Sequence, residues 1–317
     1  ENDKVLEEPT KVTGTAPLDR HTASQQQEWQ LGVIADNYVH QDCPNVMQNK
    51  VLELIDDYSS KEEPFFLYYP CHLVHGPILP DDSVKGTSGV GVYGDFVMQV
   101  DKYVGEISKK LEEKGIKDDT VFIFTSDNGA SGVADFPNLL AQGHNPSGIY
   151  RGKKMDIWEG GHREPTIVSY PSKIKAGSIA SQLVCHSDLY ATMAELLEAD
   201  YDDKTAEDSV SNLSVWRGEP GEVRKDIVHS CANGGFSIRN HKWKLNLVKN
   251  GGGTWLGEDD FGAYELYDIQ QDVKEETNVI DSNPEVVKEL IDTMKKYIHD
   301  GRSTPGEKQI NGRNNPT

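Results

Sequence analysis

The chain has 317 residues, 36% of them hydrophobic, which is enough to build a substantial core. Its 52 acidic and 32 basic residues give a formal net charge of -20, which argues against a nucleic-acid partner, because such proteins gather Lys and Arg on one face. No run approaches the roughly 18 apolar residues of a membrane span. The four cysteines form no CxxC pair, so neither a zinc site nor a redox dithiol is predicted.

The first half of the sequence predicts alternating helices and strands. We expect loop over the first 35 residues, which are polar and lack periodicity, and a helix over Cys43–Ile55. The aromatic-rich run Pro64–Cys71 predicts a strand, and apolar spacings of three and four predict a helix over 93–111. The run VFIF at 121–124 predicts the next strand. Strand, helix and strand together predict a crossover unit of a parallel sheet.

The second half changes character after a long glycine-rich segment, 128–163, and the apolar run TIVSYP. A helix is predicted over His186–Ala199 and a polar connector over Asp200–Asn212. Short apolar runs separated by turns then predict an antiparallel meander. The last predicted helix covers Asn283–Asp300, with Asn283 as N-cap and Pro284 at the first helical position.

Polar side chains follow two of the predicted strands, in CHLVH and in TSDNG. Asp127 and Asn128 offer the hard oxygen ligands that calcium and magnesium prefer, although Asp-Asn-Gly alone is more typical of a turn than of a metal site. His75 alone is more typical of a packed histidine, and Lys153 with Lys154 of a solvated pair. These residues indicate a functional site only when they occur together.

Four blocks supply that combination: PFFLYYPCHLVHGP, DKYVGEISKKLEEKGIKDDTVFIFTSDNG, YRGKKMDIWEGGHREPTIVSYPSKIKAG and SQLVCHSDLYATMAELL. In this order and spacing they resemble the second half of the formylglycine-dependent arylsulfatases. The resemblance implies an alkaline-phosphatase-like α/β fold, a mixed sheet sandwiched by helices and incomplete here, with a smaller C-terminal antiparallel sheet and a packed helix. It places the C-terminal part of the catalytic domain at 1–212 and the small α+β subdomain at 213–317.

The resemblance also implies roles for individual residues. Asp127 and Asn128 match the family's ligands for a divalent ion, usually Ca²⁺, with Mg²⁺ as an alternative. His75 matches a histidine near the leaving oxygen, and Lys154 matches the sulfate-binding lysine; a cation and a proton donor suit the charge that develops as a sulfate ester breaks.

Neighbouring residues are candidates for further contacts. His72 is a second contact or a support. Arg151 is a candidate for substrate binding, although buried ion pairs of Arg151 and Arg163 with Glu159 or Glu164 are the preferred interpretation.

The family's nucleophile is a formylglycine made from Cys or Ser in a Cys/Ser-x-Pro/Ala-x-Arg sequence, and no segment of this chain fits that pattern. We expect the nucleophile, and the paired aspartates that complete the metal site, upstream of Glu1, so that residues 1–317 alone would not turn over substrate. The resemblance implies a sulfated carbohydrate or another sulfate ester as substrate and a periplasmic or secreted location.

Two other functions stay open at this point. One is a phosphodiesterase of the alkaline phosphatase type, which usually binds two metals with more histidines. The other is a protein that binds sulfated glycan without cleaving it, which would lack the formylglycine motif altogether.

Overall fold

The computed structural model describes residues 5, 7–13, 32–253 and 261–310. The chain forms two compact units, residues 1–120 with 131–146 and residues 121–130 with 147–317. Each unit has its own hydrophobic core. This division differs from the predicted boundary at residue 212, which stays a prediction.

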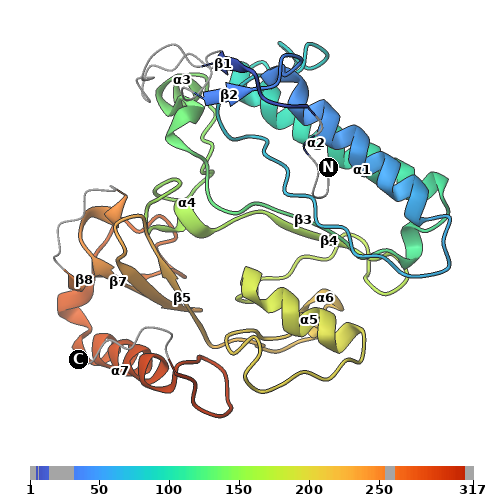
Figure 1. Ribbon diagram of the computed structural model, residues 1–317. Coiled ribbons are helices and arrows are strands. Elements are labelled where there is room, and N and C mark those ends of the chain that lie inside the picture. The colour runs from blue at the N-terminus through green and yellow to red at the C-terminus, as the bar shows by residue number, and fades with distance from the viewer. Residues whose placement is uncertain (1–4, 6, 14–31, 254–260, 311–317) are drawn as a thin grey trace. The chain divides into compact units, whose positions relative to one another are not determined.

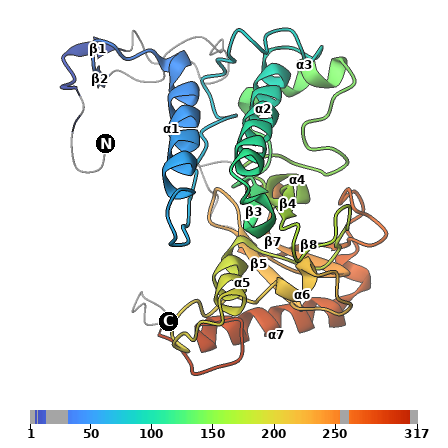
Figure 2. The ribbon, with the colours of Figure 1, turned by 90° about the vertical axis from the view of Figure 1, so that its right-hand side faces the viewer.

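Two helices run side by side in the first unit (Figures 1 and 2), namely α1, Cys43–Tyr58, and α2, Val92–Glu113. Both predicted helices are confirmed. Apolar spacing did not reveal one polar position on the buried face of α2, where Gln99 is fully enclosed. Val97, which the spacing assigned to the buried face, is instead 44% exposed. The Gln99 amide donates to the Tyr103 hydroxyl at 2.8 Å, so its polar group is satisfied inside the core.

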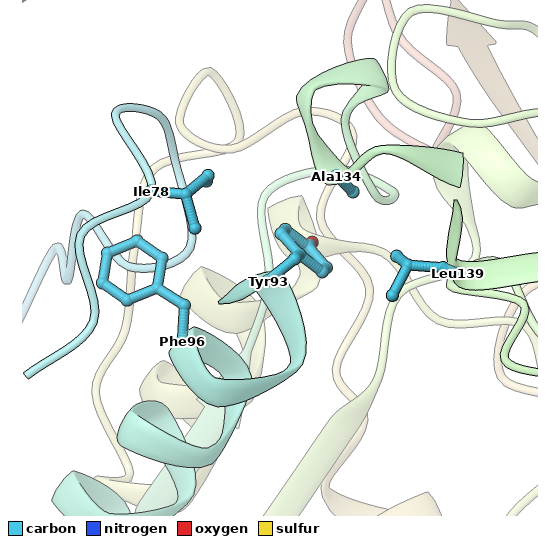
Figure 3. Packing of buried hydrophobic residues seen from close by; sticks show 5 residues of the cluster. All are labelled: Ile78, Tyr93, Phe96, Ala134 and Leu139. Carbon is cyan, nitrogen blue, oxygen red and sulfur yellow. The ribbon is translucent and has the colours of Figure 1, made fainter. Parts of the chain in front are cut away.

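Figure 3 shows the core at the start of α2. Tyr93 and Phe96 of α2 pack with Ile78, Ala134 and Leu139, which come from three other segments. The unit's shorter elements are β1 (Lys11–Thr13), which pairs antiparallel with β2 (Gly32–Ile34), η1 (His40–Asp42), η2 (Lys117–Asp119), η3 (Gly132–Ala134) and α3 (Phe136–Ala141). The loop predicted for the first 35 residues is therefore interrupted by two short strands, and 14–31 lie outside the described residues.

The strand predicted over Pro64–Cys71 is wrong, and so is the parallel crossover. Side chains in this run alternate between exposed and half-buried, as in a strand, and Phe66 and Tyr68 are 79% and 75% exposed. No strand pairs with the run in the described part of the chain. The pattern specifies an extended backbone, whereas a strand also needs a partner for its N–H and C=O groups. The strand β3, Phe122–Thr125, is confirmed, but it pairs antiparallel with β4, Thr166–Ser169.

The second unit contains the predicted antiparallel meander, which is confirmed. Its sheet has the order β5-β6-β7-β8, formed by Asp226–Ser230, Phe236–Asn240, Trp243–Val248 and Phe261–Asp268. The helix α7, Pro284–Asp300, lies along this sheet in both ribbon views and buries Leu290 and Met294 against it. Asn283 precedes the helix, but its side chain donates to the Val279 carbonyl and makes no cap, so the predicted capping role is wrong.

The remaining elements of the second unit are short. The predicted helix after His186 is confirmed as η4 followed by α5 and ends earlier than expected, at Leu196. No helix in the described ranges is long and apolar enough to cross a membrane. The elements not yet given bounds are α4 (Glu159–His162), η4 (His186–Asp188), α5 (Leu189–Leu196), α6 (Leu213–Trp216), η5 (Asn250–Gly252) and η6 (Ile280–Ser282).

Candidate functional site

The turn after β3 carries Asp127 and Asn128. The Ser126 hydroxyl donates to the Asn128 carbonyl at 3.1 Å, and the Asn128 side-chain amide donates to the Gly129 carbonyl at 3.1 Å. These bonds hold the turn and leave the Asn128 side-chain oxygen without a donor among the described residues. Asp127 is exposed, and its carboxylate likewise accepts no hydrogen bond within the described ranges. Two oxygen-bearing side chains are thus available at the end of a strand.

Glycines bring this turn against the segment that carries Lys154. A Cβ on Gly129 would lie 1.8 Å from the Gly160 carbonyl oxygen, and one on Gly160 would lie 2.4 Å from the Gly152 oxygen, so neither position can hold a side chain. The Gly129 N–H donates to the Gly161 carbonyl at 3.1 Å. Close backbone contact therefore explains several glycines of the segment 128–163.

Lys154 lies beside the turn. Its backbone N–H donates to the Ala130 carbonyl at 2.9 Å, which joins the RGKK segment to the TSDNG segment. The side chain is half-buried, and its ammonium forms no ion pair with another residue in the described part of the chain. The structure thus brings three of the predicted site residues, Asp127, Asn128 and Lys154, into one region of the second unit.

Arg151 is held by the protein itself. Its guanidinium stacks on the Trp158 ring at 3.7 Å and donates to the Glu275 carbonyl at 2.7 Å and to the Tyr267 hydroxyl at 3.3 Å. These contacts tie the glycine-rich segment to the C-terminal sheet. Substrate binding by Arg151 stays a prediction. The ion pair predicted between Arg163 and Glu159 is confirmed at 3.3 Å.

A buried ion cluster of Glu159, Arg239, Lys244 and Glu275 lies next to the glycine-rich segment. The Lys244 ammonium, fully enclosed, is 3.2 Å from Glu159 and 3.0 Å from Glu275, and Arg239 is 3.1 Å from Glu159. Burial opposes ionisation of Glu159, but the charges of Lys244 and Arg239 outweigh it and lower its pKa. Burial raises the pKa of Glu275. Sequence reasoning missed this cluster, because its members are far apart in the chain.

His162 lies at the edge of the buried ion cluster. Its ring is 4.3 Å from the ring of His229, and its Nε2 atom is buried without a hydrogen-bond partner. Burial, followed by the positive charge of Lys244, lowers the pKa of His162 to about 4. Both effects keep this histidine neutral near pH 7. It therefore packs as an uncharged ring.

Glu164, like His162, is a residue that sequence reasoning did not place in the site. Its Oε1 atom is buried and has no hydrogen-bond partner within the described ranges. Burial, and then the negative charge of Asp127, raise the pKa of Glu164 to about 8. Close by, the hydroxyls of Thr125 and Thr166 are 3.2 Å apart, and Thr125 is 3.0 Å from Nε2 of His186.

His72 and His75 lie in the first compact unit. Both are exposed, and the His75 N–H donates to the His72 carbonyl at 2.9 Å in a tight turn. The Nδ1 atom of His75 is 2.8 Å from the Gly76 carbonyl oxygen. Burial, followed by the charges of His40 and His75, lowers the pKa of His72. Their roles toward a substrate stay predictions.

Comparison with known proteins identifies the family. Residues 9–199 match the sulfatase family model. The chain is 34% identical over 276 residues to an N-acetylgalactosamine-6-O-sulfatase of Bacteroides thetaiotaomicron. The aligned region covers 84% of this chain and 53% of that protein. It is also 29% identical over 287 residues to arylsulfatase A of Bos taurus, and this alignment covers 84% of this chain and 55% of that protein.

A solved structure agrees with the sequence match. One from Bacteroides thetaiotaomicron, described in connection with the metabolism of multiple glycosaminoglycans, superposes with a TM-score of 0.75 at 33% identity, covering 84% of this chain and 57% of that one. The chain therefore belongs to the sulfatase family, and the predicted fold class is confirmed. It spans about half the length of the curated relatives it matches.

Proposed function

We propose that this chain is part of an enzyme that removes sulfate from a sulfated carbohydrate or a similar sulfate ester. The observation that carries the proposal is the backbone hydrogen bond from Lys154 to Ala130 beside the Asp127–Asn128 turn, together with a Lys154 ammonium that forms no ion pair among the described residues. An anionic substrate needs positive charge and hard oxygen ligands for a cation in one place. Membership of the sulfatase family supports this interpretation.

In this proposal Asp127 and Asn128 hold a divalent cation, Ca²⁺ or Mg²⁺. Their available oxygens fit such an ion. When bound, the cation supplies positive charge toward the sulfate oxygens. Among the described residues, no group of three or more His, Cys, Asp or Glu side chains is placed to hold a metal ion, so further ligands would come from outside these residues.

Lys154 would bind a nonbridging sulfate oxygen, since a half-buried ammonium interacts strongly with an anion in a partly desolvated site. His75 would donate a proton to the leaving oxygen, and His72 would make a second contact or support it. Arg151, fixed by Trp158 and Tyr267, would chiefly shape the Lys154 segment and reach substrate only secondarily.

The nucleophile would come from a formylglycine in a part of the protein outside residues 1–317, because no sequence in this chain fits the family's motif. We therefore propose that residues 1–317 alone do not turn over substrate. From the family resemblance we also propose that the whole protein is periplasmic or secreted. The relative named as an N-acetylgalactosamine-6-O-sulfatase suggests a first substrate to try, an N-acetylgalactosamine carrying a 6-O-sulfate.

The test uses protein expressed from the complete reading frame together with residues 1–317 alone. Each is incubated with 6-O-sulfated N-acetylgalactosamine, a sulfated aryl ester and a phosphodiester, and released sulfate and phosphate are measured. We expect sulfate from at least one sulfate ester with the complete protein and none with residues 1–317. Release of phosphate alone would favour a phosphodiesterase. Binding of the sulfated sugar without release would favour a glycan-binding protein.

A further inference from the structure

The segment that carries Lys154 forms a loop that is closed at its base. The Gly160 N–H donates to the Arg151 carbonyl at 2.7 Å, which joins the two ends of residues 151–160. A Cβ on Gly160 would lie 2.6 Å from the Arg151 carbonyl oxygen, so the closure requires glycine. We call residues 151–160 the lysine loop. Because Lys154 lies inside it, its position depends on what holds the two ends.

Glu275, which follows β8, contacts both ends of the lysine loop. Its side-chain Oε2 atom accepts a hydrogen bond from the Glu159 N–H at 2.6 Å, and its backbone carbonyl accepts one from the Arg151 guanidinium at 2.7 Å. Glu275 is fully buried, and its Oε1 atom is 3.0 Å from the ammonium of Lys244, a residue of β7. One residue thus fastens both ends of the loop to the C-terminal sheet.

The backbone of Glu275 supports a specific role for its side chain. Its φ angle is +54°, in the left-handed region that suits glycine better than a residue with a Cβ. A buried carboxylate in that conformation costs free energy both for the backbone and for the loss of water. The contacts with Glu159 and Lys244 offset these costs and account for a glutamate at this position.

Two further connections of the C-terminal sheet contact the middle of the lysine loop. After β5, the Ala232 N–H donates to the Met155 carbonyl at 3.0 Å. After β7, the Gly251 carbonyl accepts a hydrogen bond from the Ile157 N–H at 2.7 Å. The residues on either side of Lys154 are therefore bonded to the C-terminal sheet, while the Lys154 backbone is bonded to the turn after β3.

We propose that Glu275 is a positioning residue for Lys154. By fastening both ends of the lysine loop, it sets the place at which the Lys154 ammonium meets the anion. The inference rests on the proposed function, in which Lys154 contacts sulfate, and it deepens that function by giving the C-terminal sheet a role in substrate binding. Position matters because a displacement of about 1 Å in a reacting complex can lower a rate by about 100-fold.

The test is a double-mutant cycle in protein from the complete reading frame. Glu275→Leu, which removes the acceptor and keeps a similar size, is made in the wild type and in Lys154→Ala. The kcat/KM is measured from sulfate release, with 6-O-sulfated N-acetylgalactosamine or a sulfated aryl ester, whichever the complete protein cleaves faster. We expect Glu275→Leu to lower kcat/KM by about 10- to 100-fold in the wild type. In Lys154→Ala we expect a change below about 2-fold, because the effect acts through the lysine.

Two more variants separate positioning from stability. Glu275→Gln keeps one oxygen that can accept the Glu159 N–H, so it should lose less activity than Glu275→Leu, and the same cycle is run with it. Leu290→Ala is the control for destabilisation, because Leu290 is buried in the core of the same sheet and packs with no described residue of the lysine loop. We expect a lower melting temperature and an unchanged kcat/KM for Leu290→Ala.

The outcomes distinguish this inference from the proposed function. Equal factors for the Glu275 variants in the two backgrounds would overturn the inference alone, as would a loss in Leu290→Ala as large as that in Glu275→Leu. Wild-type protein that releases no sulfate, or Lys154→Ala that releases it at the wild-type rate, would overturn the proposed function and the inference with it.

Discussion

Two groups of charged residues in the second unit differ in one respect. In the buried ion cluster, Lys244 is enclosed between Glu159 and Glu275, and each charge has an opposite charge within 3.2 Å. Around the turn after β3, neither the Asp127 nor the Glu164 carboxyl accepts a hydrogen bond from a described residue, and Lys154 forms no ion pair among those residues. The charges of the first group form ion pairs within the chain, although Arg239 Nε and Glu275 Oε1 form no hydrogen bond, whereas no ion pair of Asp127, Glu164 or Lys154 occurs among the described residues.

The difference separates charges that stabilise the fold from charges that are available for a ligand in this unit. Burying a charge is costly, so a protein that places charges inside for structural reasons also supplies partners for them. Charges left uncompensated at the end of a strand fit a ligand that brings the missing charge. In the proposed function, a cation pairs with Asp127 and Asn128 and an anion pairs with Lys154.

The largest effect is expected when an ion pair of the buried ion cluster is removed. Lys244→Met would leave Glu275 with no ion-pair partner and Glu159 with fewer, at a cost of about 3–5 kcal/mol, the usual penalty for removing one partner of a buried pair. The free energy of unfolding is measured by urea titration. Lys288→Met is the matched control, because Lys288 pairs with Asp292 on an exposed face of α7 at 2.7 Å. We expect no measurable change for that variant.

A double variant makes the comparison sharper. Lys244→Met combined with Glu275→Gln removes a carboxylate that the first change leaves unpaired, so we expect it to recover part of the lost stability. If Lys244→Met were no more destabilising than Lys288→Met, the buried ion cluster would not contribute to stability as described.

A smaller effect depends on pH at the edge of the same cluster. The folded-state pKa of His162 is lowered to about 4, against about 6.5 in the unfolded chain. Between these values the unfolded chain binds a proton that the folded one does not, so His162 reduces stability as the pH falls from about 6.5 to about 4. His162→Leu should remove a loss on the order of 3 kcal/mol across this window.

The measurement is urea unfolding of the wild type and His162→Leu at several pH values between 4 and 8. Comparing the two proteins cancels the titration of groups that His162 does not influence. His229 is not one of these, because burial and then the charges of Lys244 and His162 lower its pKa. Parallel stability curves for the two proteins would show that His162 takes up its proton equally well in both states.

Local patterns explain what could be predicted from the sequence. Apolar spacing predicts α1 and α2 because one face of each helix is buried, and short runs with glycine turns predict the sheet from β5 to β8. Asp127 and Lys154 could be placed in a candidate site through the family's motifs, since those motifs keep their order and spacing. Their proximity in the structure, through the hydrogen bond to Ala130, agrees with that placement.

Pairing between distant segments explains what could not be predicted. The run Pro64–Cys71 has a strand-like alternation, but alternation does not say whether a partner strand exists. Nothing local indicates that β3 pairs antiparallel with β4. Lys244 and Glu275 likewise meet only because the C-terminal sheet brings them together, so their charges looked like ordinary surface residues in the sequence.

The most direct test of Lys154 compares two lysine variants of the protein from the complete reading frame. Lys154→Ala should lower kcat/KM for the sulfate ester by about 100- to 1,000-fold, because a charge aimed at the reacting anion is lost. Lys109→Ala should leave it nearly unchanged, since the Lys109 side chain is 77% exposed on α2 and, among the residues that the structure describes, pairs only with Glu113 at 3.5 Å. Equal and small losses in both variants would contradict a sulfate-binding role for Lys154.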